Sequence, residues 1–99
     1  MNEQTIPQEL LHFIKSVASE SRLKILLLFM GGQELTVNQI AATVGLGQST
    51  TSEHLKIMRR SGLLICNKRG KEVYYQPDRA RIIHHLESLG DILKSCCNL

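Results

Sequence analysis

The sequence predicts a mainly α-helical domain that carries one small β-hairpin. Three observations support this fold class. Apolar residues recur at helical spacing along most of the chain, hydrophobic residues make up 42% of it, and one short stretch alternates in the manner of paired strands. At 99 residues, the chain is expected to form a single domain over residues 1–99.

Three helices are predicted in the first half of the chain. The first, in PQELLHFIKSVA, places its apolar residues on one face. The second, in RLKILLLFM, is expected to begin after Ser21, to end at Gly31, and to be buried because it is apolar nearly all round. The third, in VNQIAATVG, is expected to begin after Thr36 and to end at Gly45.

The second half predicts two more helices and the hairpin. After a short turn that contains Gly47, a fourth helix in QSTTSEHLKIMRRSG has Leu55 and Met58 as inward anchors. Two β-rich runs, residues 63–66 and 72–75, then flank a basic turn with a glycine, and a final helix follows in residues 78–97. The predicted order is therefore α-α-α-α-β-β-α with about five helices. Two helices joined by a short turn and followed by a hairpin describe a winged helix-turn-helix.

Positive charge is concentrated in one part of the chain. Half of the 12 Lys and Arg residues fall between positions 56 and 71, and no acidic residue interrupts them. Charged residues are usually just solvated surface, but an acid-free cluster favours a polyanionic partner. The cluster consists of Lys56, Arg59, Arg60, Lys68, Arg69 and Lys71.

The fourth helix begins with short polar residues. In a recognition helix, this N-terminal part contacts base edges in the major groove of double-stranded DNA. Gln48 can pair with adenine, while Ser49 and Ser52 can bond bases or phosphates. Thr50 and Thr51 offer hydroxyls, or methyl groups that pack on thymine. The predicted base-reading and phosphate-binding residues are Gln48, Ser49, Thr50, Ser52, Glu53, His54, Lys56, Arg59, Arg60, Lys68, Arg69 and Lys71.

Two residues of this set each have more than one possible role. Glu53 is repelled by phosphate, yet its carboxylate can accept a hydrogen bond from cytosine; alternatively it pairs with Lys56 one helical turn later. His54 either caps or packs within the helix-turn-helix, or bonds a phosphate.

The segments SESRLKILLLF, ELTVNQIAATVGLGQSTTSEHLKIMRRSGLL and KRGKEVYYQ resemble the ArsR/SmtB family of bacterial winged-helix repressors over roughly residues 16–76. The resemblance implies a homodimer that binds a palindromic operator and releases it when an inducer binds. It also implies that the first and last helices form the dimer contact, which agrees with an apolar stripe in the last helix. The expected seam consists of Leu10, Ile14, Ile82, Leu86, Leu89 and Leu93.

The metal sites of the family are not matched. Thr36 and Asn38 stand where its thiol site has Cys-x-Cys. Its zinc site on the last helix is also unmatched, because the corresponding positions include Ala80, Ile92 and Ser95. We therefore expect no resident metal and no cofactor, and the inducer stays unidentified.

Three cysteines form no disulfide framework, which suits a reducing cytoplasm. Cys66 is expected to be a small core residue. Cys96 and Cys97 are a candidate thiol switch, since adjacent thiols can chelate trivalent arsenic or be oxidised. In the alternative, Cys96 packs in the apolar stripe and Cys97 has no role.

These patterns also exclude some classes of function. No nucleophile, base and orienting group occur in a combination that suggests an enzyme. The first ten residues lack a secretory signal and no apolar run is long enough to span a membrane, so a cytoplasmic location is expected. The alternatives to an operator-binding repressor are a winged helix that binds only proteins, and a thiol-based arsenic sensor.

Overall fold

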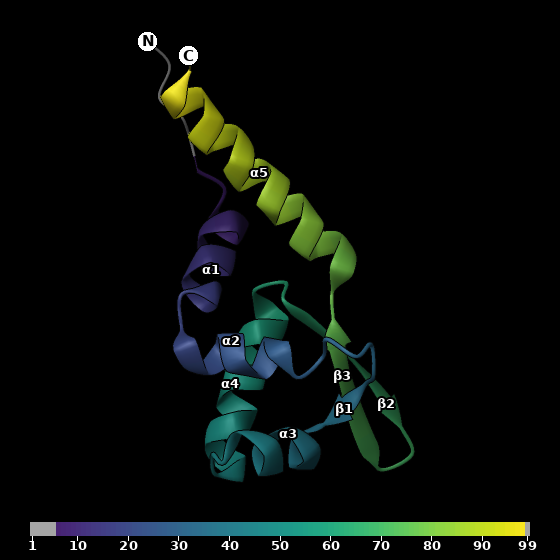
Figure 1. Ribbon diagram of the computed structural model, residues 1–99. Coiled ribbons are helices and arrows are strands. Elements are labelled where there is room, and N and C mark those ends of the chain that lie inside the picture. The colour runs from purple at the N-terminus through teal and green to yellow at the C-terminus, as the bar shows by residue number, and fades with distance from the viewer. Residues whose placement is uncertain (1–5, 99) are drawn as a thin grey trace.

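A computed structural model describes residues 6–98 and contains five helices and three short strands in this range (Figure 1). The predictions of one domain over residues 1–99 and of no secretory signal also involve residues outside the described range. In chain order the elements are α1 (Gln8–Val17), α2 (Glu20–Leu27), β1 (Leu35–Thr36), α3 (Val37–Val44), α4 (Gln48–Arg60), β2 (Leu64–Arg69), β3 (Glu72–Pro77) and α5 (Arg79–Cys97).

The strands form one antiparallel sheet in the order β1-β3-β2. β2 and β3 pair from Leu64 opposite Pro77 to Arg69 opposite Glu72, which confirms the predicted hairpin and lengthens both of its strands. β1 was not predicted. Its two residues pair with the other edge of β3, and two residues are too few to show the alternation by which a strand is recognised.

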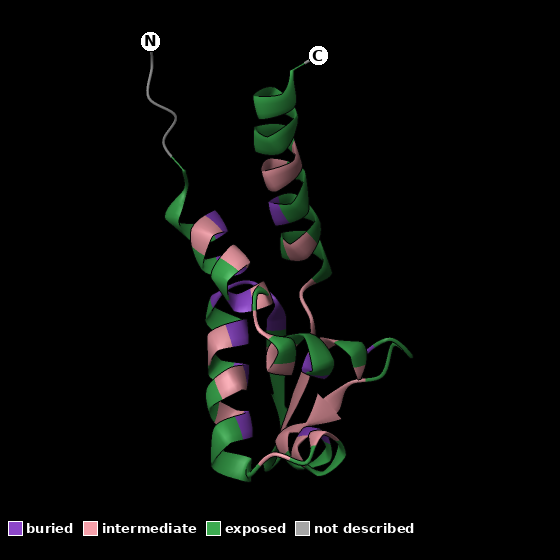
Figure 2. Ribbon diagram, turned by 60° about the vertical axis from the view of Figure 1, so that its left-hand side comes forward, coloured by how far each residue is buried: buried purple, intermediate pink, exposed green. Residues whose placement is uncertain are grey.

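The core gathers apolar side chains from α1, α2, α3, α4 and the start of β2. In Figure 2 the buried residues line the inner faces of the helices in the lower part of the molecule, whereas most of α5 is exposed. The core is mostly aliphatic, as expected for a chain without Trp, and also contains Phe13 and Phe29. Its fully or nearly fully buried members are Leu10, Phe13, Ile25, Phe29, Ile40, Leu55, Met58, Leu63 and Leu64.

The predictions for the second helix were partly wrong. Its N-cap is Ser19 rather than Ser21, because the Ser19 hydroxyl accepts a hydrogen bond from the backbone N–H of Arg22 at 3.3 Å. The helix is not buried all round either, since it packs on α1 and α3 with one side only. Ile25 faces the core, but Leu23 and Leu27 are exposed; the helix ends at Leu27 rather than at Gly31, and the exposed Met30 lies in the turn after it.

Helix α5 leaves the sheet and runs past α1 to the far end of the molecule (Figures 1 and 2). The Asp78 side chain caps it by accepting a hydrogen bond from the backbone N–H of Arg81 at 3.2 Å. The two helices meet where the His85 ring packs on Phe13, with 4.6 Å between the ring centroids. No helix in residues 6–98 is both long enough and apolar enough to cross a membrane.

The expected dimer seam needs one correction. Leu10 is 1% exposed and lies in the core of the single chain, so its side chain has no surface left for a second copy. Three of the other seam residues, Ile14, Ile82 and Leu89, are partly buried against the same core. Leu86 and Leu93 are the exposed members, at 54% and 55%.

His85 makes the stability of the fold depend on pH. Burial lowers the pKa of His85 below its usual value, and the charges of His84 and Arg81 lower it further, against a weaker opposite effect of Glu9 and Asp78. The unfolded chain therefore binds a proton at about pH 6.5 that the folded chain binds only at lower pH. We expect the free energy of unfolding to fall as the pH drops from about 7 to about 5, measured by urea denaturation at constant protein concentration.

The matched variants are His85→Leu, which should flatten this pH dependence, and His12→Gln, which should retain it because His12 is exposed on α1. An unchanged pH dependence in His85→Leu would contradict the assignment.

Candidate DNA-binding surface

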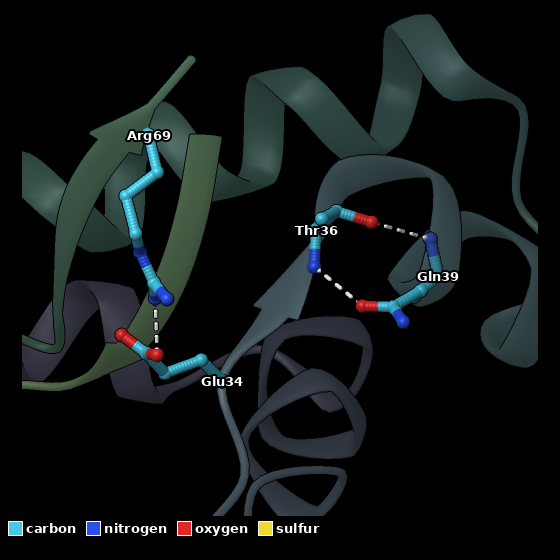
Figure 3. A network of polar contacts seen from close by, with 4 residues as sticks. All are labelled: Glu34, Thr36, Gln39 and Arg69. Carbon is cyan, nitrogen blue, oxygen red and sulfur yellow. Dashed lines mark hydrogen bonds and ion pairs between the residues drawn. The ribbon is translucent and has the colours of Figure 1, made fainter. Parts of the chain in front are cut away.

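Helices α3 and α4 form the predicted helix-turn-helix. A reciprocal capping box starts α3: the Gln39 N–H donates to Thr36 Oγ1 at 3.3 Å, and the Thr36 N–H donates to Gln39 Oε1 at 2.8 Å (Figure 3). Gly45 ends the helix in the left-handed conformation, with φ 73°. Only residues 45–47 separate the two helices, so α3 fixes the start of α4 closely.

Burial of one face sets the rotation of α4. Thr51, Leu55 and Met58 are each 0% exposed and point into the core. Thr51 was proposed to contact thymine, and this interpretation is wrong because its side chain is covered. The opposite face carries the short polar residues, which line one open hollow with Lys56: Gln48, Ser49, Ser52 and Glu53.

Most predicted contact residues on α4 are available to a ligand. Gln48, Ser49, Thr50, Glu53, Lys56, Arg59 and Arg60 are exposed, and Ser52 is half-buried. No ion pair joins Glu53 to Lys56 in the described residues. The Glu53 carboxylate therefore lies on the outer face with its acceptor atoms unused by Lys56.

His54 belongs to the protein framework rather than to the outer face. It is half-buried, and its Nδ1 lies 3.2 Å from Arg22 Nη1. A guanidinium only donates, so Nδ1 is the acceptor in this bond. Of the alternatives for His54, the structure favours packing within the helix-turn-helix over a phosphate contact.

Arg22 itself holds three helices together. Its Nε donates to the backbone oxygen of Ser16 at 2.8 Å and its Nη2 to that of Lys15 at 3.5 Å. These carbonyls belong to the last turn of α1, where backbone oxygens lack a partner within the helix. Arg22 thus joins the end of α1 to α2 and, through His54, to α4. In the sequence, Arg22 stood out only as part of the segment SESRLKILLLF that resembles the family.

The three predicted cations of the wing differ in their surroundings. Lys68 and Lys71 are exposed. Arg69 forms an ion pair with Glu34, just before β1 (Figure 3), and its guanidinium carbon lies 4.1 Å from the centre of the Tyr74 ring. Arg69 therefore holds the wing in place through these contacts. Its partner Glu34 was not predicted from the sequence, because 35 positions separate the two residues.

The cysteines lie in two separate places. Cys66 is half-buried on β2 opposite Tyr75, whose pKa is raised by burial and by the nearby thiol. Cys96 and Cys97 are exposed on the last turn of α5, at the other end of the molecule from the sheet (Figure 1). Within residues 6–98 no three His, Cys, Asp or Glu side chains come together in a way that would hold a metal ion.

These elements define a winged helix-turn-helix domain, and comparisons with known proteins identify its family. Residues 19–65 match the model of the bacterial regulatory proteins of the arsR family. The chain is 35% identical over 75 residues to the cadmium resistance transcriptional regulatory protein CadC of Listeria innocua, which covers 76% of this chain and 63% of that protein. It is 38% identical over 66 residues to the arsenical resistance operon repressor of Escherichia coli, covering 67% and 56% respectively.

A solved structure agrees with the sequence matches. The homodimeric winged helix-turn-helix DNA-binding domain of Mb0332 from Mycobacterium bovis superposes with a TM-score of 0.70 at 25% identity, over 92% of this chain and 91% of that one. The chain belongs to the ArsR family of bacterial regulatory proteins. Its relatives are regulators, which agrees with the expectation that it is not an enzyme.

Replacing Arg22 tests its bridging role. Arg22→Lys keeps the charge but cannot supply the planar fork that reaches two carbonyls and His54 at once. We expect the free energy of unfolding to fall by about 1.5–3 kcal/mol, the usual range for hydrogen bonds to charged groups. The measurement is urea denaturation followed by circular dichroism.

Arg79→Lys is the matched control, because Arg79 is exposed at the start of α5. Equal stability of Arg22→Lys and the wild type would mean that the bridge is dispensable.

Proposed function

We propose that the chain is a homodimeric, sequence-specific DNA-binding regulator of transcription, a repressor that leaves a palindromic operator when an inducer binds. One observation carries this proposal. The polar outer face of α4 carries exposed basic residues on its own later turns, and Gln48 at its start lines a hollow together with the exposed Lys71 of the wing. A helix of this kind fits the major groove, and cations on the same side fit the flanking phosphates.

The proposed roles follow the exposure and the contacts of the side chains. Gln48, Ser49, Thr50, Ser52 and Glu53 would contact bases. His54 and Arg69 would act indirectly, by holding α4 and the wing. Since the proposed target is DNA, the protein would act in the cytoplasm. The phosphate contacts would come from Lys56, Arg59, Arg60, Lys68 and Lys71.

Removing the free cations of the wing should weaken DNA binding without changing its specificity. We expect Lys68→Gln/Lys71→Gln to lose affinity equally for the preferred site and for random DNA. The slope of log affinity against log salt should become shallower by about 1–2, because each lost phosphate contact removes about 0.9. Fluorescence anisotropy with the DNA upstream of the protein's own gene measures both quantities.

Lys24→Gln is the control, since Lys24 is exposed on α2 and pairs with Glu20 there. Absence of specific binding at low salt would refute the proposal and favour a winged helix that binds only proteins.

Glu53→Gln tests separately whether Glu53 reads a base: an unchanged preferred site would exclude that role. Transcription that rises when the protein is added would contradict repression.

The dimer would form along the exposed apolar face of α5. Ile83, Leu86 and Leu93 are 52%, 54% and 55% exposed there, and their spacing of 3 and 7 residues keeps them on one side of the helix. We expect Leu86→Glu/Leu93→Glu to sediment as a monomer, because two carboxylates in an apolar contact are costly. Leu27→Glu, at a 60% exposed position of α2, should stay dimeric. A dimeric double variant would exclude this face.

The adjacent thiols support one candidate for the inducing signal. Cys96 and Cys97 are both exposed, so thiophilic ions and oxidants can reach them. If they are the switch, trivalent arsenic or peroxide should abolish DNA binding by the reduced wild type but not by Cys96→Ser/Cys97→Ser, measured by the same anisotropy assay with zinc as a further arm. DNA binding by the wild type that is indifferent to all three agents would rule the thiols out.

A further inference from the structure

A cavity of about 320 Å³ lies between α1, α2 and the C-terminal part of α4. Its size is within the range of about 300–1,000 Å³ that is typical of small-molecule sites. Ile57 gives it an apolar wall. Four basic side chains line it and, within residues 6–98, no acidic one does: His12, Lys15, Arg22 and Arg60.

The charge of Arg22 is only partly used by the protein. Its three hydrogen bonds, to the backbone oxygens of Ser16 and Lys15 and to His54 Nδ1, go to neutral acceptors. A guanidinium has more N–H groups than these bonds need. No carboxylate of the described residues forms an ion pair with Arg22. The cavity therefore has a concentrated positive charge without a counter-charge, which favours an anion.

Ser16 provides a second, independent observation. It is 2% exposed and lines the same cavity, yet its Oγ has no hydrogen-bond partner. Buried hydroxyls without a partner are rare in native proteins, and each one calls for an explanation. A rotation of this side chain toward a bound anion would give the hydroxyl an acceptor.

We propose that this cavity binds a small organic phosphate. Several cations around one point suit the double negative charge of a phosphate better than the single charge of a carboxylate. The guanidinium groups of Arg22 and Arg60 and the ammonium group of Lys15 would hold the phosphate. Ile57 would pack against a short carbon body.

The position of the cavity links this ligand to DNA binding. Arg60 and Ile57 belong to α4, and Arg22 holds α4 through His54. A bound dianion neutralises cations close to the DNA-contacting helix and so weakens its attraction to phosphates. The ligand is thus an inducer. This consequence depends on the proposed DNA-binding function, whereas the binding of the anion does not.

The first experiment measures anion binding without DNA. The full-length, ¹⁵N-labelled protein is titrated with glycerol 3-phosphate and inorganic phosphate, with glycerol as the neutral control and chloride matching the ionic strength. We expect saturable shifts of the backbone amides of Ser16 and Ile57 with both phosphates and none with glycerol. Lys15→Gln should weaken the affinity by about threefold or more, the loss of one charged contact.

Lys24→Gln is the matched control and should bind phosphate as the wild type does, because Lys24 does not line the cavity. Absence of saturable shifts, an equal effect of both Lys variants, or shifts centred on the outer face of α4 and on the wing would each overturn the proposal.

The second experiment adds DNA. In the wild type, saturating glycerol 3-phosphate should lower DNA affinity by about threefold beyond the effect of chloride at equal ionic strength. In Lys15→Gln at the same ligand concentration the decrease should be smaller. If Lys15→Gln instead weakens DNA binding itself and reduces its salt dependence, the cavity serves a DNA phosphate and the small-ligand proposal is wrong. A protein that binds no DNA would fail the proposed function but leave the anion titration intact.

Discussion

The burial of one face of α4 is the constraint on which the rest of the structure depends. Thr51, Leu55 and Met58 are completely covered, and removing such side chains from a core typically costs several kcal/mol. This energy fixes the rotation of the helix about its axis. The same rotation decides which side chains face outward, so the outer surface of α4 is determined by the packing of its inner face rather than by any contact of its own.

Two sets of polar contacts fix the neighbouring elements relative to α4. Thr36 ends β1 and caps α3, so the sheet and the helix-turn-helix share one residue. The ion pair of Glu34 with Arg69 adds a second link between that segment and the wing. On the other side, Arg22 joins the end of α1 to α4 through His54. One link therefore holds the wing and the other holds α4, each against a segment that lies earlier in the chain.

Sequence periodicity and capping residues were enough to predict the helices, the hairpin and their order, because these depend on local spacing and on turn chemistry. Apart from the cap of the second helix and the two-residue β1, the errors arose where tertiary contacts decide. Thr51 appeared equivalent to Thr50, and only the helix rotation shows that one of them is buried. Leu10 lay in an apolar stripe that serves the core of one chain rather than a second copy. His54 lies 32 positions from Arg22, and Glu34 lies 35 positions from Arg69, which is beyond any local pattern.

The long α5 gives the molecule a length of 53 Å against a width of 24 Å. If two chains join along this helix, its length and its angle to the rest of the domain set the distance between the two copies of α4. Regulators of this kind contact half-sites separated by about one turn of DNA. An operator with extra base pairs at its centre would move one half-site along and around the duplex, and the stiff helix could not follow. Discrimination between operators would then depend on their spacing as well as on their bases.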